Sequence, residues 1–344
     1  MKVHTVQGAK GPVKVGVIEV PSFYLDANAR EAGDPNYNNT TADVRALLDQ
    51  LRKQRVDVVA IDLRENGGGS LSEAVSLTGL FIDTGPVVHI WDNKSKPEFM
   101  ADETAGTSWD GPLVVLTSDL SASASEIFAG AIQDYGRGLI VGSPSTHGKG
   151  TVQTVMDLEP VFRASTRGAP DEPVAGALKL TTHTFFRVSG GSTQLEGVHA
   201  DVVIPSPWEG LEIAEKDLDH ALPWTKIQPP VPYEPVGEPR GLAVPLQRAS
   251  DARVASEQWF KWQAEDVAER KAEKDKKVSL NLEERKKEKA RFEVKRAERG
   301  LAPVPDPENP GAEPEPPEAP DYILEESLKV TADFYAALNA TAAN

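Results

Sequence analysis

The feature that most constrains the fold is a series of short apolar segments that alternate with amphipathic helical patterns. Continuous apolar runs of this length are typical of strands that lie in a parallel sheet and are covered on both faces. The predicted strands are residues 13–20, 56–63, 112–118 and 138–143, and the predicted helices between them are residues 40–54, 71–82 and 123–136. This alternation predicts an α/β fold with mostly parallel strands.

Charge and composition exclude several classes of function. The chain has 37 Lys and Arg against 53 Asp and Glu, a net charge of −16. Nucleic acid and anionic membrane surfaces need a basic face, so neither is expected as a partner. Cysteine is absent, which excludes a thiol nucleophile. No apolar run reaches the roughly 18 residues that span a bilayer, and the N-terminus lacks the apolar core of a signal peptide.

The sequence beyond the predicted sheet changes character twice, and we therefore expect three regions. Residues 1–210 hold the α/β core, and residues 211–250 form a proline-rich connector. Residues 251–344 are expected to form a helical C-terminal domain, with a charged helical pair, a proline-rich linker at 302–320 and a last amphipathic helix. In the charged pair, Asn281 and Glu284 form a capping-box pattern.

Three loops beside the predicted strands are candidates for chemistry, because ligands of open α/β sheets bind at strand ends. The first is "LRENGGGS", residues 63–70. Three successive glycines let backbone amides approach a ligand and hold a developing negative charge. The alternative is a tight turn from strand to helix.

The second loop, "SDLSASASEIFAG", carries serines at alternate positions. Ser123 and Glu126 fit a capping box, which makes Ser123 an ordinary N-cap. A serine at this place can also be a nucleophile, since the helix dipole and the Ala124 amide favour a developing oxyanion. The stretch does not have the G-x-S-x-G pattern of α/β-hydrolases.

The third loop, "STHGKGTVQTV", places Lys149 between two glycines. Gln153 lies four residues further on and shares a face with Lys149 if the segment is a strand. Burial disfavours the ammonium form and lowers the pKa of a lysine, and a neutral amine can accept a serine proton. An exposed turn is the alternative for an isolated G-K-G.

Together these segments carry a resemblance to a known family. The stretches "DLRENGGGSLSEAVSLTGLF", "SASASEIFAGAIQDYGRGLIVG" and "GKGTVQ" resemble the C-terminal processing peptidases, peptidase family S41, and within it the tail-specific proteases of the Gram-negative periplasm. The resemblance covers roughly residues 13–206. The charged tail is similar to the helical C-terminal domain of the long members.

The resemblance implies a ClpP/crotonase-like core and a role for each candidate residue. Ser123 corresponds to the nucleophile, Lys149 to the general base and Gln153 to the residue that orients the base. The oxyanion donors correspond to the amides of Ala124 and Gly69. No metal or other cofactor is implied.

The resemblance also implies an activity and its partners. It implies a serine endopeptidase that cleaves proteins or peptides near apolar C-terminal tails in the periplasm, with an adaptor protein as a further expected partner. The peptide-binding PDZ domain and N-terminal helical region of long members have no counterpart in this sequence. We therefore expect a truncated or minimal member.

The third loop departs from the family pattern. His147 stands where the family usually has Phe, and the loop is one residue longer, so His147 is a rival base and Lys149 can be displaced. Two other functions stay open. One is a catalytically silent peptide-binding core. The other is a crotonase-like acyl-CoA enzyme, for which the acidic net charge is poorly suited.

Overall fold

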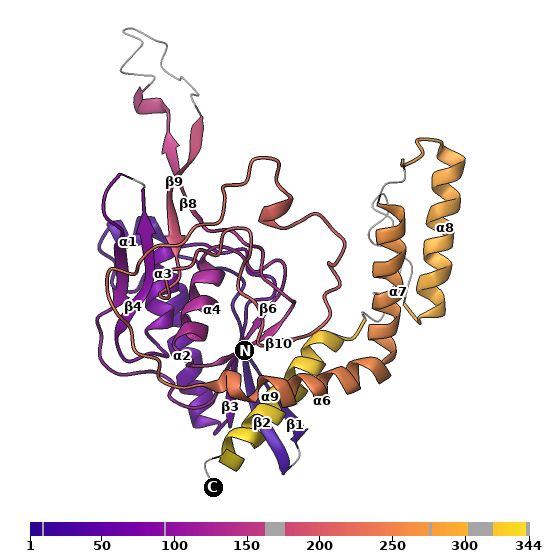
Figure 1. Cartoon of the computed structure of the whole chain (residues 1–344), viewed down its shortest axis with the longest axis horizontal. Helices are drawn as coiled ribbons and strands as arrows, with labels where there is room; N and C mark the ends of the chain where they lie inside the picture. The colour runs from indigo at the N-terminus through magenta and orange to yellow at the C-terminus, as the bar shows by residue number, and fades with distance from the viewer. Residues whose placement is uncertain (9, 93, 162–175, 275–276, 302–318, 342–344) are drawn as a thin grey trace.

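The computed structural model describes residues 1–8, 10–92, 94–161, 176–274, 277–301 and 319–341, and its ribbon is drawn in Figure 1. Two sheets form the framework of this part of the chain. The strand order of the first is β1 (Lys2–Gly8), β2 (Gly11–Glu19), β3 (Val58–Asp62), β6 (Leu113–Thr117), β7 (Leu139–Gly142) and β10 (Val202–Val203). From β2 to β10 the neighbouring strands are parallel, and β1 pairs antiparallel with β2.

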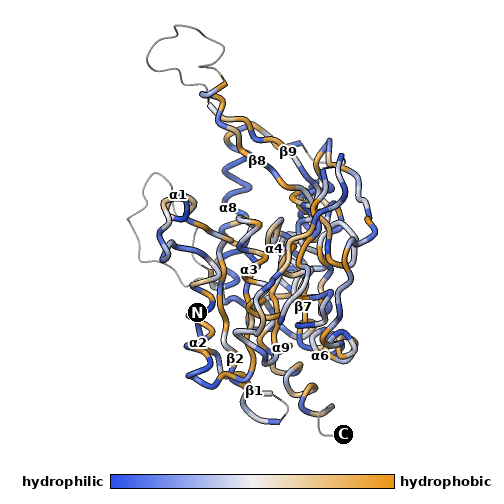
Figure 2. The backbone as a smooth tube through the Cα atoms, turned by 90° about the vertical axis from the view of Figure 1, so that its left-hand side faces the viewer, coloured by the Kyte–Doolittle hydropathy of each residue, from blue (hydrophilic) through white to orange (hydrophobic). Residues whose placement is uncertain are grey.

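The second sheet is antiparallel. Its order is β5 (Glu98–Asp102), β4 (Gly85–Trp91), β9 (Ala177–Phe186) and β8 (Thr151–Asp157). The β8–β9 ribbon extends away from the rest of the core in both Figure 1 and Figure 2. Since β8 begins two residues after Lys149, the base of this ribbon positions the third candidate loop.

Helices cover both faces of the parallel sheet. The helices of the described chain are α1 (Ala27–Glu31), α2 (Thr40–Lys53), α3 (Leu71–Thr78), α4 (Ala124–Asp134), α6 (Ala243–Ser256), α7 (Gln258–Glu273), α8 (Leu282–Glu298) and α9 (Tyr322–Thr341), with 3₁₀ turns η1 (Glu215–Asp217) and η2 (Pro239–Leu242). Of these, α2, α3 and α4 pack on one face of the sheet, and α6 and α9 pack on the other. Ile61 of β3 packs in the cluster that contains α2, α3 and α4 residues, whereas its neighbour Ala60 packs with α6 and α9 residues. Alternate side chains of a strand point to opposite faces, so the apolar runs of the sequence serve two layers.

The predicted fold class is confirmed: the core is α/β with a mostly parallel sheet, and the C-terminal region is helical. The charged pair is α7 and α8, and ion pairs such as Lys295–Glu269 at 2.7 Å join the two helices. Asn281 caps α8 as predicted, since its side chain accepts from the Glu283 and Glu284 amides. The prediction for residues 302–320 falls almost wholly outside the described residues, and the division of the chain at residues 210 and 250 stays a prediction.

Several elements differ from the sequence-based expectation. Helix α6 begins inside the connector expected at residues 211–250 and continues into the region expected to be helical. Several prolines precede it, and Pro245 lies in its first turn, where proline is tolerated. The helical pattern of residues 40–54 suggested Thr41 as the N-cap, whereas Asn39 caps α2 and accepts from the Ala42 amide at 2.8 Å. Strands β1, β4 and β5 were not predicted, because none of them carries a long continuous apolar run.

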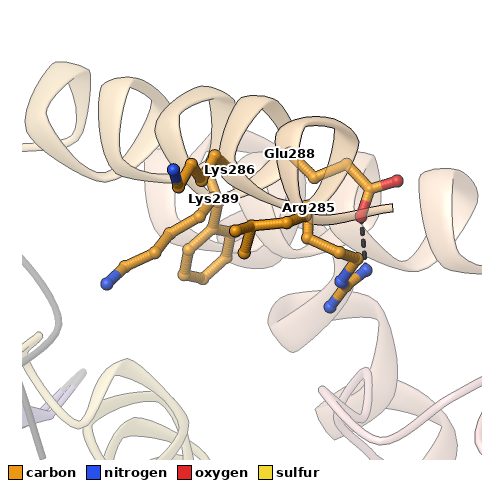
Figure 3. A pocket seen from close by; sticks show the side chains of 6 residues that line it. Arg285, Lys286, Glu288 and Lys289 are labelled. Carbon is orange, nitrogen blue, oxygen red and sulfur yellow. Dashed lines mark hydrogen bonds and ion pairs between the residues drawn. The ribbon is translucent and has the colours of Figure 1, made fainter. Parts of the chain in front are cut away.

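Two surface findings bear on binding. Among the described residues, no helix combines the length and apolar character needed to cross a bilayer. A pocket lies along α8 (Figure 3). Its lining residues are Leu282, Arg285, Lys286, Glu288, Lys289 and Phe292, and none of them belongs to the three candidate loops.

Candidate active site

The glycine loop after β3 is held by Asn66, which is fully buried. The Asn66 side chain donates to the Val20 carbonyl and accepts from the Gly68 amide, each at 2.8 Å. Phe23 pairs with the loop through the Gly68 carbonyl and the Ser70 amide, at 2.9 and 2.8 Å. These bonds fix the glycines in one conformation.

Glycine is required at two positions of this loop. Gly69 has a φ of +142°, and a Cβ there would lie 2.3 Å from the Phe23 carbonyl oxygen. Gly68 has a φ of +109°, and its Cβ would lie 2.9 Å from the Ser123 Cβ and 3.2 Å from the Ala124 amide nitrogen. The glycine loop therefore lies directly against the start of α4, and no side chain fits between them.

Two backbone amides beside Ser123 have no hydrogen-bond acceptor within the described part of the chain. The pairing with Phe23 uses atoms of Gly68 and Ser70, so the Gly69 amide stays without a partner. Ala124 is the first residue of α4, where an amide has no acceptor in the preceding turn. Such amides can bind an oxyanion.

The three serines differ in what their hydroxyls contact. The Ser121 hydroxyl donates to the Leu63 carbonyl at 2.7 Å, and the Ser125 hydroxyl donates to the Asn66 carbonyl at 2.8 Å. Both side chains are buried, and both tie α4 to the glycine loop. The Ser123 side chain makes no capping hydrogen bond and is half-buried. Ser123 is therefore the serine of this run that is available for chemistry.

The backbone of Ser123 is strained. Its φ of 59° is in the left-handed region, which residues other than glycine rarely adopt. Such strain persists where the surrounding structure imposes it, and it gathers at active sites. The capping-box interpretation holds only in part: Glu126 accepts from the Ser123 amide at 2.7 Å, whereas the Ser123 hydroxyl does not cap α4.

Glu126 has a larger role than its place in the capping pattern indicated. Its carboxylate is buried and accepts four hydrogen bonds, from the Ser123 amide (2.7 Å), the Thr146 hydroxyl (2.6 Å), the Gly148 amide (2.7 Å) and the Lys149 amide (3.0 Å). One carboxylate thus joins the serine loop to the lysine loop. Burial raises the pKa of Glu126 to about 7, against the lowering effect of these donors.

Lys149 lies two residues before β8, with its amine directed to Gln153. The Nζ atom donates to Gln153 Oε1 at 3.3 Å, so the predicted pairing of these two side chains is present. Burial lowers the pKa of Lys149, and the positive charge of Lys179 lowers it further, whereas Glu215 and Glu126 act in the opposite direction. A larger share of neutral amine is the result.

His147 is half-buried beside the lysine. Its backbone amide donates to the Ser121 carbonyl at 3.0 Å, and its Nδ1 lies 4.0 Å from Glu215 Oε2. Burial holds the pKa of His147 below its usual value. Within the described ranges, no group of three or more potential ligand side chains is arranged to hold a metal ion.

Comparison with known proteins adds the family. The model of peptidase family S41 matches residues 14–204, more than half of the chain. This chain belongs to peptidase family S41. A second model, the C-terminal domain of tail-specific protease, matches residues 209–336. Membership of S41 leaves the acyl-CoA alternative without support.

The relatives named below are tail-specific or C-terminal processing proteases. The tail-specific protease of Haemophilus influenzae is 37% identical over 93% of this chain and 44% of its own length. The carboxy-terminal-processing protease of Bartonella bacilliformis is 33% identical over 51% of this chain and 37% of its own length. Among solved structures, the photosystem II D1 C-terminal processing protease has a TM-score of 0.44 and 28% identity, covering 56% of this chain and 42% of that one. The chain spans less than half the length of these relatives.

Proposed function

We propose that this S41 chain is a serine endopeptidase in which Ser123 is the nucleophile and Lys149 the general base. The observation that carries the proposal is the buried carboxylate of Glu126, which binds the backbone amides of both residues. Ser123 also has a strained backbone and a hydroxyl that does not cap α4, as a nucleophile at this place requires. Gln153 is the orienting residue for the Lys149 amine.

The proposed reaction proceeds through an acyl-enzyme. The Ser123 oxygen attacks the scissile carbonyl while the neutral Lys149 amine accepts the hydroxyl proton. The amides of Ala124 and Gly69 stabilise the oxyanion of the tetrahedral intermediate. The Lys149 ammonium then protonates the leaving amine as the C–N bond breaks. A water molecule, deprotonated by the same amine, hydrolyses the ester and restores Ser123.

The substrates and setting follow from the family rather than from the geometry of the site. We propose protein or peptide substrates with apolar C-terminal tails, an adaptor protein as a further partner, and action in the periplasm. Tail-specific and carboxy-terminal-processing proteases are the names of the relatives that match this chain. The site itself needs no cofactor for the steps above.

Cleavage of an unfolded test protein by four chains tests the proposal. The wild type and His147→Ala are expected to cleave it, and Ser123→Ala and Lys149→Ala are expected to be inactive. An inactive His147→Ala chain with an active Lys149→Ala chain would identify histidine as the base. A folded wild-type chain that neither cleaves nor reacts with a fluorophosphonate supports the alternative of a silent peptide-binding core.

A further inference from the structure

Glu215 connects the C-terminal region to the loop of Lys149. It is the first residue of η1, inside the segment 209–336 that matches the C-terminal domain of tail-specific protease. The loop that it contacts lies in the segment matched to the protease family. Its side chain is nearly buried, with 9% of the residue exposed. A nearly buried carboxylate at such a junction needs partners, since an unpaired buried charge is costly.

The partners of Glu215 flank Lys149 on both sides. The Glu215 amide donates to the His147 carbonyl at 3.0 Å. Gln194 donates from Nε2 to Glu215 Oε1 at 3.0 Å and accepts the Gly150 amide at 2.8 Å through its own Oε1. The Glu215 backbone thus holds residue 147 directly, and its carboxylate holds residue 150 through the Gln194 side-chain amide. Lys149 lies between these two points.

The remaining carboxylate oxygen faces an imidazole without a hydrogen-bond partner. His147 Nδ1 is buried and neither accepts nor donates a hydrogen bond. It lies 4.0 Å from Glu215 Oε2. The other charged groups that act on His147 are Asp217 of η1 and Lys149 of its own loop. A Phe at position 147, usual in the resembling family, would offer Glu215 no such partner.

We propose that Glu215 is a positioning residue for the proposed base: from the C-terminal region it holds the loop of Lys149 through His147 and Gln194. The inference rests on the proposed function, in which Lys149 must reach the Ser123 proton. Mutual placement of nucleophile and base within about 1 Å decides rates of this kind.

The charge of Glu215 gives the proposal a signature that a merely structural role lacks. The groups acting on Lys149 are Lys179, which lowers its pKa, and Glu215 and Glu126, which raise it. Glu215→Gln keeps an oxygen for Gln194 and removes the negative charge. The pKa of Lys149 then falls further, so activity that depends on the neutral amine begins at lower pH.

Kinetics of three full-length variants test the proposal. Glu215→Gln is expected to move the rising limb of the kcat/KM profile to lower pH. Glu215→Ala is expected to lower kcat roughly 10- to 100-fold with a smaller change in KM. The control Glu212→Gln removes a surface carboxylate of the same segment, one that pairs with Lys274. It should leave both kcat and the pH profile of kcat/KM unchanged. A Glu215→Ala chain with wild-type kcat overturns the proposal. So does a Glu215→Gln chain whose kcat/KM profile rises at the same pH as that of the wild type.

A second measurement is independent of turnover. In a Ser123→Ala background, hydrogen–deuterium exchange of residues 145–152 is expected to quicken in Glu215→Ala and to stay unchanged in Glu212→Ala. Unchanged exchange of this segment in Glu215→Ala overturns the inference whatever the activity. If the wild type shows no Ser123-dependent cleavage, the proposed function fails, and exchange still decides whether Glu215 holds the loop.

Discussion

The substitution Glu126→Gln tests whether one buried carboxylate organises the site. In the wild type, two donors meet each carboxylate oxygen: the Thr146 hydroxyl and Gly148 amide at Oε1, and the Ser123 and Lys149 amides at Oε2. Glutamine replaces one oxygen by an NH₂ group, which cannot accept. Two donors therefore lose their acceptor, at a cost of about 1–3 kcal/mol each.

The same substitution removes a buried charge, which has the opposite effect and depends on pH. The pKa of Glu126 rises from 4.5 to about 7 on folding. A carboxyl with a raised pKa in the folded state favours folding below its unfolded pKa, and that contribution is lost as pH rises through the folded value. The shift corresponds to about 3 kcal/mol, at 1.36 kcal/mol per pKa unit. The wild type thus loses about 3 kcal/mol between pH 4.5 and pH 8 through this group.

Urea unfolding of the wild type and Glu126→Gln across this pH range measures the difference. The stability gap between them is expected to narrow by about 3 kcal/mol from pH 4.5 to pH 8. Cleavage at pH 8 is expected to fall about 100-fold, because the loop of Lys149 loses at least one of its bonds to residue 126, which joins it to the loop of Ser123. Glu98→Gln, which changes an exposed glutamate of β5, is the matched control. A gap that does not vary with pH, or a fully active variant, would refute this reasoning.

Two further substitutions test other parts of the site. Gly68→Ala is expected to abolish cleavage in a chain that still folds by circular dichroism, because the new Cβ would lie 2.9 Å from the Ser123 Cβ; measurable activity would show that the loop can move aside. Lys179→Met is expected to move the rising limb of the kcat/KM profile to higher pH, opposite to Glu215→Gln, since Lys179 lowers the pKa of Lys149. A limb that moves to lower pH would contradict that role.

Local sequence patterns predicted the parts of the fold that depend on neighbours along the chain. Continuous apolar runs identified β3, β6 and β7, because strands covered on both faces must be apolar throughout. A run rich in valine identified β2. The glycine loop, the serine run and the G-K-G segment stood out because all three lie beside predicted strands, at whose ends ligands of open α/β sheets bind. The pairing of Lys149 with Gln153 followed from the two-residue period of a strand.

The contacts that join these loops could not be read in the same way. Glu126 fitted a short-range capping pattern, and its bonds to residues 146, 148 and 149 depend on how the α4 loop and the β8 loop meet in space. Glu215 lies more than 60 residues from His147 in the chain. The antiparallel strands β4 and β5 mix polar and apolar residues without a long apolar run, so no apolar period indicated them.

The C-terminal region is part of the core and not only an attachment to it. In the first sheet, Val15, Val17 and Val58 point to the face that α6 and α9 cover, and there they pack with Leu246 and Phe334. Without those helices, this face would be an apolar surface open to water, which folded domains avoid. The region that buries the second face of the sheet also supplies Glu215 to the proposed base. Stability of the core and placement of Lys149 therefore depend on the same segment of the chain.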